Sequence, residues 1–382
     1  MDLAVRVLDV GAGFTGVLRS CDDVWPDQTA LVDFGAQSGS RATAALQRHT
    51  SWWFRPALPV EMFVLSHPHL DHYNGLLEYA MQRRSGVKAY PPLFAADSTF
   101  HHPRIPDDAD SREFLLRLAS VNAVASDVPD IAIAASISVC AAGVVNREPL
   151  ARGMRFSVAG EACEVLWPPQ TLPDNARARL RTLVDRYDTL ANELQELDDS
   201  RLHNELAGMR EAAALDPESV IYGRATEITA ESLEEAEKRP GGQSSPSDQS
   251  IPPDAESQIQ ASIKSLQDAL SDGGNLLSLV FTSIDRRFVF LGDLDRSLHG
   301  EVAVDLMSYS PELVISAHHG THFGDPLTEL TSRYVISSVG GSLAGKVRSG
   351  YDQMGMHLRT DRAGDISALL NQGSTRIWTH LP

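Results

Sequence analysis

One short segment of the chain concentrates side chains that bind metal ions. Residues 67–72 read His-Pro-His-Leu-Asp-His, so three imidazoles and one carboxylate lie within six positions. Imidazole nitrogens and carboxylate oxygens are the donors that Zn²⁺ and similar divalent ions accept in proteins. An apolar run at 62–65 comes before the segment, and Gly75 and a predicted helix over 76–83 come after it. This context of strand, ligands and helix favours a metal site over a histidine-rich loop without metal.

Backbone geometry divides the four side chains between two ions. Alternate residues of an extended chain point the same way, so His67 and His69 can share the first ion. Asp71 and His72 follow where the chain turns, and we expect them to face a second ion. Six residues alone cannot enclose two ions, so ligands are also expected from later strand ends.

Two later segments repeat the arrangement of a strand followed by a ligand. Residues 288–293 read Phe-Val-Phe-Leu-Gly-Asp, which puts Asp293 just past a buried strand at a glycine turn, where it could bridge the ions. Residues 314–320 end in His318, His319 and a glycine. His318 directly follows the strand and is the predicted ligand of the second ion. His319 is predicted to contact substrate or act as an acid, and the reverse order is the alternative.

The other histidines and strand-end carboxylates give weaker signals. Asp33 ends a strand and is expected to accept a hydrogen bond from the far ring nitrogen of a ligand histidine, whereas turn capping also explains such residues, Asp9 among them. The pair at 101–102 lies in a proline-rich loop and is expected to face solvent. His357 lies in a strand-like stretch and is a less favoured late ligand. No role is expected for His203, His299 or His322.

The elements that position these residues follow from hydrophobic patterning. Short apolar runs closed by glycine or proline indicate strands. The run 131–145 is shorter than a membrane-spanning helix and rich in β-branched residues, which favours buried strands. A hairpin is predicted from strands at 276–282 and 287–291. Further strands are predicted at 5–10, 30–33, 60–66, 87–90, 164–167, 313–317, 334–339 and 356–359.

An acidic, helical segment separates the two halves of the chain. Leucines recur at near-helical spacing among charged residues, which predicts an amphipathic insertion over 171–272. Residues 171–270 contain 20 acidic and 10 basic side chains, so they carry −10 of the net charge of −18. Composition predicts a flexible linker near 240–254 and a last helix over 255–270. The insertion could pack on the catalytic domain, cover the cleft, or form a homodimer or partner interface.

Composition also restricts partners and location. Nucleic-acid binders usually carry a basic surface, and a net charge of −18 does not support that class, although a local basic groove would not appear in composition. The three cysteines are an odd number without a CxxC pair, which fits a reducing compartment. Neither a signal-peptide pattern nor a membrane-spanning run is recognised. We therefore expect a cytoplasmic protein with no membrane contact.

The ligand motifs resemble those of the metallo-β-lactamase superfamily. His67-x-His69-x-Asp71-His72 is similar to its signature, and Leu291-Gly292-Asp293 looks like its later bridging aspartate. A closer resemblance is to the hydrolase domain of the competence protein ComEC, in the same order along most of the chain outside 171–270. Its further motifs here are Leu8-Asp9-Val10-Gly11-x-Gly13, Leu31-Val32-Asp33-x-Gly35, Val165-Leu166-Trp167-Pro168-Pro169, Asn275-Leu276-Leu277-Ser278-Leu279-Val280, His318-His319-Gly320-Thr321, Val335-Ile336-Ser337-x-Val339-Gly340 and Arg359-Thr360-Asp361-x-x-Gly364-x-Ile366.

The resemblance implies an α/β fold, namely a four-layer αβ/βα metallo-β-lactamase sandwich with a helical insertion. Residues 1–170 and 273–382 would form its two halves, with the metals at one edge between two sheets. In ComEC the domain is thought to degrade one DNA strand. Asn275 and Ser278 lie where many superfamily members have another histidine, and are expected to support the ligands. The chain has no membrane channel, and residues 340–343 replace a late His-Pro of the relatives.

Three functional hypotheses follow. The first is a hydrolase with one or two divalent ions, Zn²⁺ before Mn²⁺, whose metal-bound hydroxide attacks a phosphodiester or other small anionic substrate, as a nuclease would. Asp71 and Asp293 would be essential, and His319 would protonate the leaving group. The second is hydrolysis of a small ester, lactone or amide, which the acidic composition mildly favours over DNA. The third is a non-catalytic interaction module with a degraded site, which the intact segment 67–72 disfavours.

Overall fold

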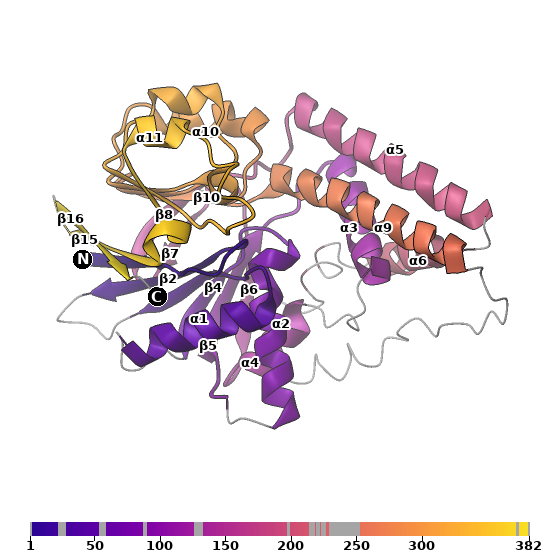
Figure 1. The fold of residues 1–382 in the computed structure, drawn as a ribbon, viewed down its shortest axis with the longest axis horizontal. Coiled ribbons are helices and arrows are strands. Elements are labelled where there is room, and N and C mark those ends of the chain that lie inside the picture. The colour runs from indigo at the N-terminus through magenta and orange to yellow at the C-terminus, as the bar shows by residue number, and fades with distance from the viewer. Residues whose placement is uncertain are drawn as a thin grey trace.

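The protein is built from two β-sheets that stack face to face between outer layers of helices (Figure 1). The computed structural model describes residues 2–21, 28–52, 59–86, 90–125, 133–196, 199–213, 218, 222, 227–228, 253–371 and 374–380. The predicted α/β class and four-layer αβ/βα sandwich are confirmed by this arrangement.

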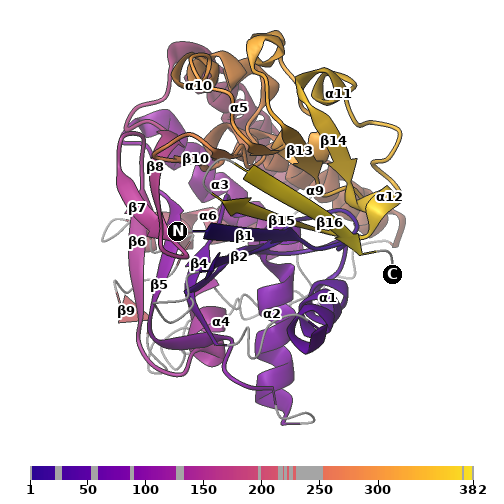
Figure 2. The same ribbon diagram turned by 90° about the vertical axis from the view of Figure 1, so that its left-hand side faces the viewer.

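The larger sheet holds the strand that precedes the histidine segment. Its strands are Asp2–Val7 (β1), Thr15–Cys21 (β2), Thr29–Phe34 (β3), Val60–Val64 (β4), Phe94–Pro103 (β5), Val145–Leu150 (β6), Glu227–Ile228 (β9), Asp365–Asn371 (β15) and Ser374–His380 (β16). Their order is β16-β15-β1-β2-β3-β4-β5-β6-β9, so the last two strands of the chain lie beside the first (Figure 2). From β3 to β6 neighbours are parallel, and their carboxyl ends reach one edge.

The smaller sheet holds the strands that precede the later ligands. Its strands are Arg155–Val158 (β7), Glu161–Trp167 (β8), Val280–Ser283 (β10), Phe288–Phe290 (β11), Leu313–Ile315 (β12), Tyr334–Ser337 (β13) and Met356–Arg359 (β14), in the order β14-β13-β12-β11-β10-β8-β7. β10 and β11 pair antiparallel, which confirms the predicted hairpin. β11 to β14 are parallel, so their carboxyl ends also share one edge.

Side-chain alternation along the central strands explains the layers. On β3, Leu31 packs into the core under the helices, whereas the adjacent Val32 packs between the sheets. On β4, Phe63 likewise packs into the core under the helices, and Val64 packs between the sheets. These strands are buried on both faces, which is why they read in sequence as continuous apolar runs.

Helices cover the outer face of each sheet (Figure 1). Gly39–Trp52 (α1), Leu70–Ser85 (α2) and Ile133–Cys140 (α4) lie beside the larger sheet. His299–Leu306 (α10) and Gly350–Met354 (α11) lie beside the smaller one, and Thr360–Ala363 (α12) precedes β15. Short 3-10 turns span Asn275–Leu277 (η1), Arg296–Leu298 (η2), Ala317–Gly320 (η3) and Asp325–Glu329 (η4).

The remaining helices form a group at one end of the sandwich (Figure 1). Asp174–Glu196 (α5), Arg201–Ala213 (α6) and Pro253–Gly274 (α9) come from the acidic segment, and all three pack on Ala109–Ala125 (α3) from the first half of the chain. Leu180, Tyr187 and Leu266 are among the buried side chains of this group and belong to the same core cluster as the sheet residues. Of the predicted linker near 240–254, residues 240–252 lie outside the described residues.

Several sequence predictions need correction. The run 131–145 was expected to form strands, but its central part is helix α4, because apolar side chains buried on all sides read alike in a helix and a strand. Most of the strand expected at 87–90 lies outside the described residues. The sequence pattern did not identify β2, β5, β15, β16 or helix α3. No helix within the described part of the chain is both long and apolar enough to cross a membrane.

Candidate metal centre

Asp293 lies at the centre of a cluster of imidazoles. Its Oδ2 is 3.2 Å from Nε2 of His72, 3.6 Å from Nε2 of His319, 3.8 Å from Nε2 of His318 and 3.9 Å from Nε2 of His67. The side chain follows β11, and only 4% of the residue is exposed. A buried carboxylate that faces four imidazole nitrogens is placed as a bridging ligand would be.

Asp71 marks a second part of the same cluster. Its Oδ2 is 3.6 Å from Nε2 of His319, and its Oδ1 is 4.0 Å from Nε2 of His72. Three groups in the described residues have ligand atoms within 4.8 Å of one another, namely His67 with His72 and Asp293, Asp71 with His72 and His319, and Asp293 with His318 and His319. His319 therefore lies where the sequence analysis expected His318, in the group with Asp71 and His72.

His69 joins the cluster through His67. Its Nδ1 lies 2.8 Å from Nε2 of His67, so the two side chains converge as alternate residues of an extended segment should. The end of helix α9 closes the space behind it, because a Cβ added to Gly274 would lie 2.5 Å from Nε2 of His69. The last residue of helix α9 therefore lies directly against a candidate ligand.

The turn that carries Asp71 depends on a close backbone approach. His69 is the residue before helix α2, and Asp71 lies in the first turn of that helix. The backbone N–H of Phe14 donates to the Asp71 carbonyl at 3.3 Å. A Cβ at Gly35 would come within 2.0 Å of that carbonyl oxygen, so only glycine fits there.

The two later histidines lie on a left-handed backbone. His318 has φ 46° and His319 has φ 57°, and Gly320 continues the turn with φ 82°. Such values cost about 1–3 kcal/mol for each non-glycine residue and persist only where the surroundings enforce them. The buried hydroxyl of Tyr351 accepts from the N–H of Ala317 at 3.0 Å and holds the start of this segment. The unusual turn directs both imidazoles toward Asp293.

Asp33 orients two of the imidazoles. Its carboxylate accepts from the Ser66 N–H at 2.6 Å and the Ser66 hydroxyl at 2.7 Å, and lies 2.7 Å from Nδ1 of His72. Because an ionised carboxylate only accepts, His72 donates through Nδ1 and presents Nε2 to Asp293. The Ser66 hydroxyl donates its hydrogen to Asp33, so toward Nδ1 of His67, at 2.9 Å, it acts as an acceptor. This geometry matches the supporting role expected for Asp33.

Ser278 and Asn275 contribute in different ways. The Ser278 hydroxyl accepts from the Asp293 N–H at 2.8 Å and lies 3.5 Å from Nδ1 of His67. It therefore contacts both the loop that carries Asp293 and the imidazole of His67. Asn275 acts through its backbone carbonyl, which accepts from the Asp295 N–H at 3.3 Å. Its side-chain oxygen has no hydrogen-bond partner among the described residues.

Electrostatics couple these groups strongly. Burial opposes ionisation of Asp293, but His72, His319 and His318 outweigh it and hold the pKa of that carboxyl well below its usual range. Burial also opposes the imidazolium of His72, yet Asp293, Asp33 and Asp71 raise its pKa well above the usual value. Nε2 of His72 and of His319 are buried with no hydrogen-bond partner in the described residues. Nitrogens without hydrogen-bond partners that face carboxylates are suited to hold a divalent ion, because such an ion would be a partner for both the nitrogens and the carboxylate oxygens.

The remaining candidates lie outside this cluster. His101 and His102 were expected in a solvent-facing loop, but both are buried on β5, where His102 stacks on Tyr222 with ring centroids 3.9 Å apart. His357 bonds to Ser337 and Asp352 through its two ring nitrogens, each at 2.8 Å. The unfavoured His322, by contrast, contacts His318 at 2.8 Å. The sequence signal that could have identified His322 is its position four residues after His318.

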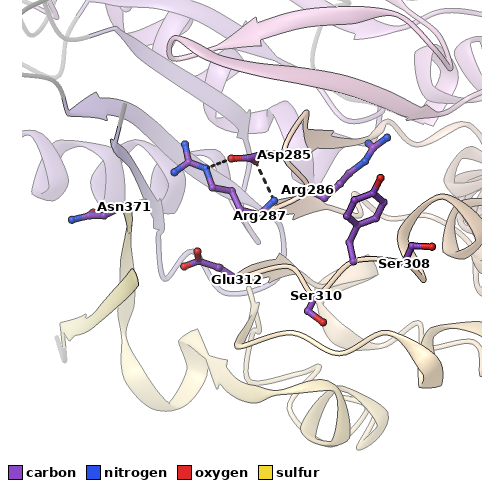
Figure 3. A pocket seen from close by; sticks show the side chains of 8 residues that line it. Asp285, Arg286, Arg287, Ser308, Ser310, Glu312 and Asn371 are labelled. Carbon is purple, nitrogen blue, oxygen red and sulfur yellow. Dashed lines mark hydrogen bonds and ion pairs between the residues drawn. The ribbon is translucent and has the colours of Figure 1, made fainter. Parts of the chain in front are cut away.

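A separate cavity lies at the opposite edge of the smaller sheet (Figure 3). Arg287 and Glu312 line it just before β11 and β12, whereas the ligands follow the other ends of these strands. Its two arginines are already paired, since Arg286 lies 2.7 Å from Glu164 and Arg287 lies 2.6 Å from Glu161. This cavity therefore does not belong to the candidate metal centre.

Solved structures with some likeness to this chain carry metallo-beta-lactamase descriptions. The metallo-beta-lactamase fold protein YhfI from Bacillus subtilis aligns with a TM-score of 0.39 and 10% identity, over 99% of each chain. A metallo-beta-lactamase family protein from Thermus thermophilus aligns with a TM-score of 0.24 and 19% identity, over 43% of this chain and 51% of that one. No protein-family model and no curated protein matches the chain. Because both TM-scores are below 0.5, the assignment of the site rests on its own geometry.

Proposed function

We propose that this protein is a metal-dependent hydrolase whose preferred substrates are phosphodiesters. The observation that carries the proposal is the convergence of imidazoles from both sheets on the buried carboxylate of Asp293. His67 and His69 would hold one divalent ion, Asp71, His72 and His319 another, and Asp293 would contact both. Zn²⁺ is the expected ion for such nitrogen and oxygen donors, with Mn²⁺ the alternative.

Divalent ions at such a site lower the pKa of water and offset negative charge that develops on a phosphoryl or carbonyl group. The protein's own residues prepare the site for them. Asp33 fixes the tautomers of His72 and, through Ser66, of His67. The Ser278 hydroxyl holds the backbone of Asp293. These contacts keep the donors in place before substrate arrives, so little reorganisation is needed during reaction.

A basic side chain beside the cluster supports an anionic substrate. The backbone N–H of Arg348 donates to the Gly320 carbonyl at 2.9 Å, and its Nε donates to the Thr321 carbonyl at 3.1 Å. Arg348 is exposed, and no carboxylate of the described residues pairs with it. An arginine that contacts the two residues directly after His319, and that has no acidic partner among the described residues, suits the oxygens of a phosphate group.

A substrate panel tests the proposal. Protein loaded with Zn²⁺ or Mn²⁺ is assayed on bis-p-nitrophenyl phosphate, single-stranded DNA, nitrocefin and a lactone. We expect hydrolysis of the phosphodiesters, and a higher KM for them in Arg348→Gln. Turnover of nitrocefin or the lactone alone would favour the second candidate, a hydrolase of a small ester, lactone or amide, which the acidic composition mildly favours over DNA as substrate. Metal binding without any hydrolysis would favour a non-catalytic module.

A further inference from the structure

His322 connects a candidate ligand to the loop that carries Asp293. Nε2 of His322 lies 2.8 Å from Nδ1 of His318, and Nδ1 of His322 lies 3.4 Å from the carbonyl oxygen of Leu294. Leu294 directly follows Asp293 in the chain. The line of contacts therefore starts at His318 and ends on the backbone of the residue that follows Asp293.

The chemistry of the acceptor fixes the direction of these hydrogen bonds. A carbonyl oxygen only accepts, so Nδ1 of His322 must carry the hydrogen. In the neutral imidazole Nε2 then has a lone pair and accepts from Nδ1–H of His318. His318 is left with a lone pair on Nε2, the atom that lies 3.8 Å from Oδ2 of Asp293. A lone pair opposite a carboxylate is repulsive unless a cation lies between them.

His322 is itself held in place by a buried group. The Tyr351 hydroxyl donates to the carbonyl of His322 at 2.6 Å while it accepts from the N–H of Ala317 at 3.0 Å. Tyr351 is fully buried, so this link between the two ends of the left-handed segment is protected from water. The imidazole of His322 can therefore act as a fixed acceptor for His318.

From these contacts we infer that His322 is a positioning residue, which sets the tautomer of His318 so that Nε2 of His318 is a ligand of the metal centre beside His319. The inference rests on the proposed function only for the presence of a divalent ion. It adds His318 to the proposed ligands, as the fourth imidazole that faces Asp293. It also gives a role to His322, a histidine that the sequence did not favour. Loss of the hydrogen-bond partner of a ligand histidine commonly weakens metal binding about 10- to 100-fold.

Zn²⁺ affinity, measured by competition with a chromophoric chelator, tests the inference. His322→Leu removes the acceptor and should weaken binding about 10- to 100-fold. His322→Gln offers an amide oxygen in its place and should retain most of the affinity. His299→Gln is the matched control, because His299 also contacts the Leu294 carbonyl, at 3.1 Å, but its other nitrogen accepts from the Gly324 N–H and touches no proposed ligand.

A second readout does not depend on metal or on activity. Long-range ¹H–¹⁵N NMR spectra of the metal-free protein should show His318 with its hydrogen on Nδ1, and His322→Leu should abolish this single-tautomer signal. Wild-type affinity in His322→Leu, an equal loss in His299→Gln, or a hydrogen on Nε2 of His318 would each overturn the inference. A wild-type protein that binds no Zn²⁺ would instead overturn the proposed function.

Discussion

The Oδ2 atom of Asp293 lies 3.2 Å from Nε2 of His72, although the two residues follow strands of different sheets and lie in different halves of the chain. His72 lies in the first turn of helix α2, which follows β4 of the larger sheet, and Asp293 follows β11 of the smaller one. The carboxyl ends of the parallel strands in both sheets meet at this point. The contact therefore depends on how the two sheets pack, and it defines the centre of the site.

The first prediction concerns Asp293 itself. Asp293→Asn removes the charge that faces four imidazoles, so the protein should lose stabilisation by Zn²⁺. A ligand at 100 times its Kd stabilises a folded protein by about 2.7 kcal/mol. Thermal unfolding with and without a chelator should show this difference in wild type and little of it in the variant. Asp268→Asn, an exposed residue paired with Lys264 on helix α9, is the control and should respond as wild type does.

The second prediction separates two strand-end aspartates of the first half. Asp33→Asn should lower Zn²⁺ affinity about 10- to 100-fold, because one buried carboxylate orients His72 and, through Ser66, His67. Asp9→Asn should have little effect, since Asp9 pairs with Arg41 at 3.2 Å rather than with a histidine. Isothermal titration with Zn²⁺ distinguishes them, and equal losses in both variants would argue against the role of Asp33.

The third prediction concerns the acidic segment as part of the folded core. Leu266 on helix α9 is 1% exposed and packs in the main hydrophobic cluster. Leu266→Ala should lower the free energy of unfolding by about 2–5 kcal/mol. Urea unfolding followed by fluorescence measures the change, and Lys264→Ala, exposed on the same helix, is the control. A separate early transition in Leu266→Ala would show that the helices unfold independently.

The fourth prediction uses a buried histidine away from the metal centre. Burial lowers the pKa of His102 to about 3, below its value in the unfolded chain. The unfolded state therefore binds more protons between about pH 6.5 and pH 3, and stability falls as the pH falls through this range. His102→Phe, which keeps a ring beside Tyr222, removes this term.

Urea unfolding at pH 7.5 and pH 5 measures that difference. Between these values His102→Phe should lose about 2 kcal/mol less stability than wild type, at 1.36 kcal/mol for each pKa unit. An equal loss in both proteins would mean that His102 is protonated in the fold at pH 5.

The ligand types were available from sequence because their signal is local. A run of apolar residues, then a turn, then an imidazole or a carboxylate predicts a group at a strand end, and strand ends of parallel strands share one edge. Residues 67–72 and Asp293 could therefore be singled out without knowledge of the sheet order. The helical character of the acidic segment was equally local, since spacing along one helix reveals it.

Sequence by itself determined which donor atoms this protein has and that each follows a strand. Tertiary structure decided which donors meet, because distances between strands depend on sheet order and on the packing of one sheet against the other. It placed His319 beside Asp71, joined His322 to His318, and buried the pair at 101–102. Two successive left-handed residues at 318–319 are uncommon outside glycine even for histidine, so local sequence does not predict them, and contacts from Tyr351 accompany them in the fold.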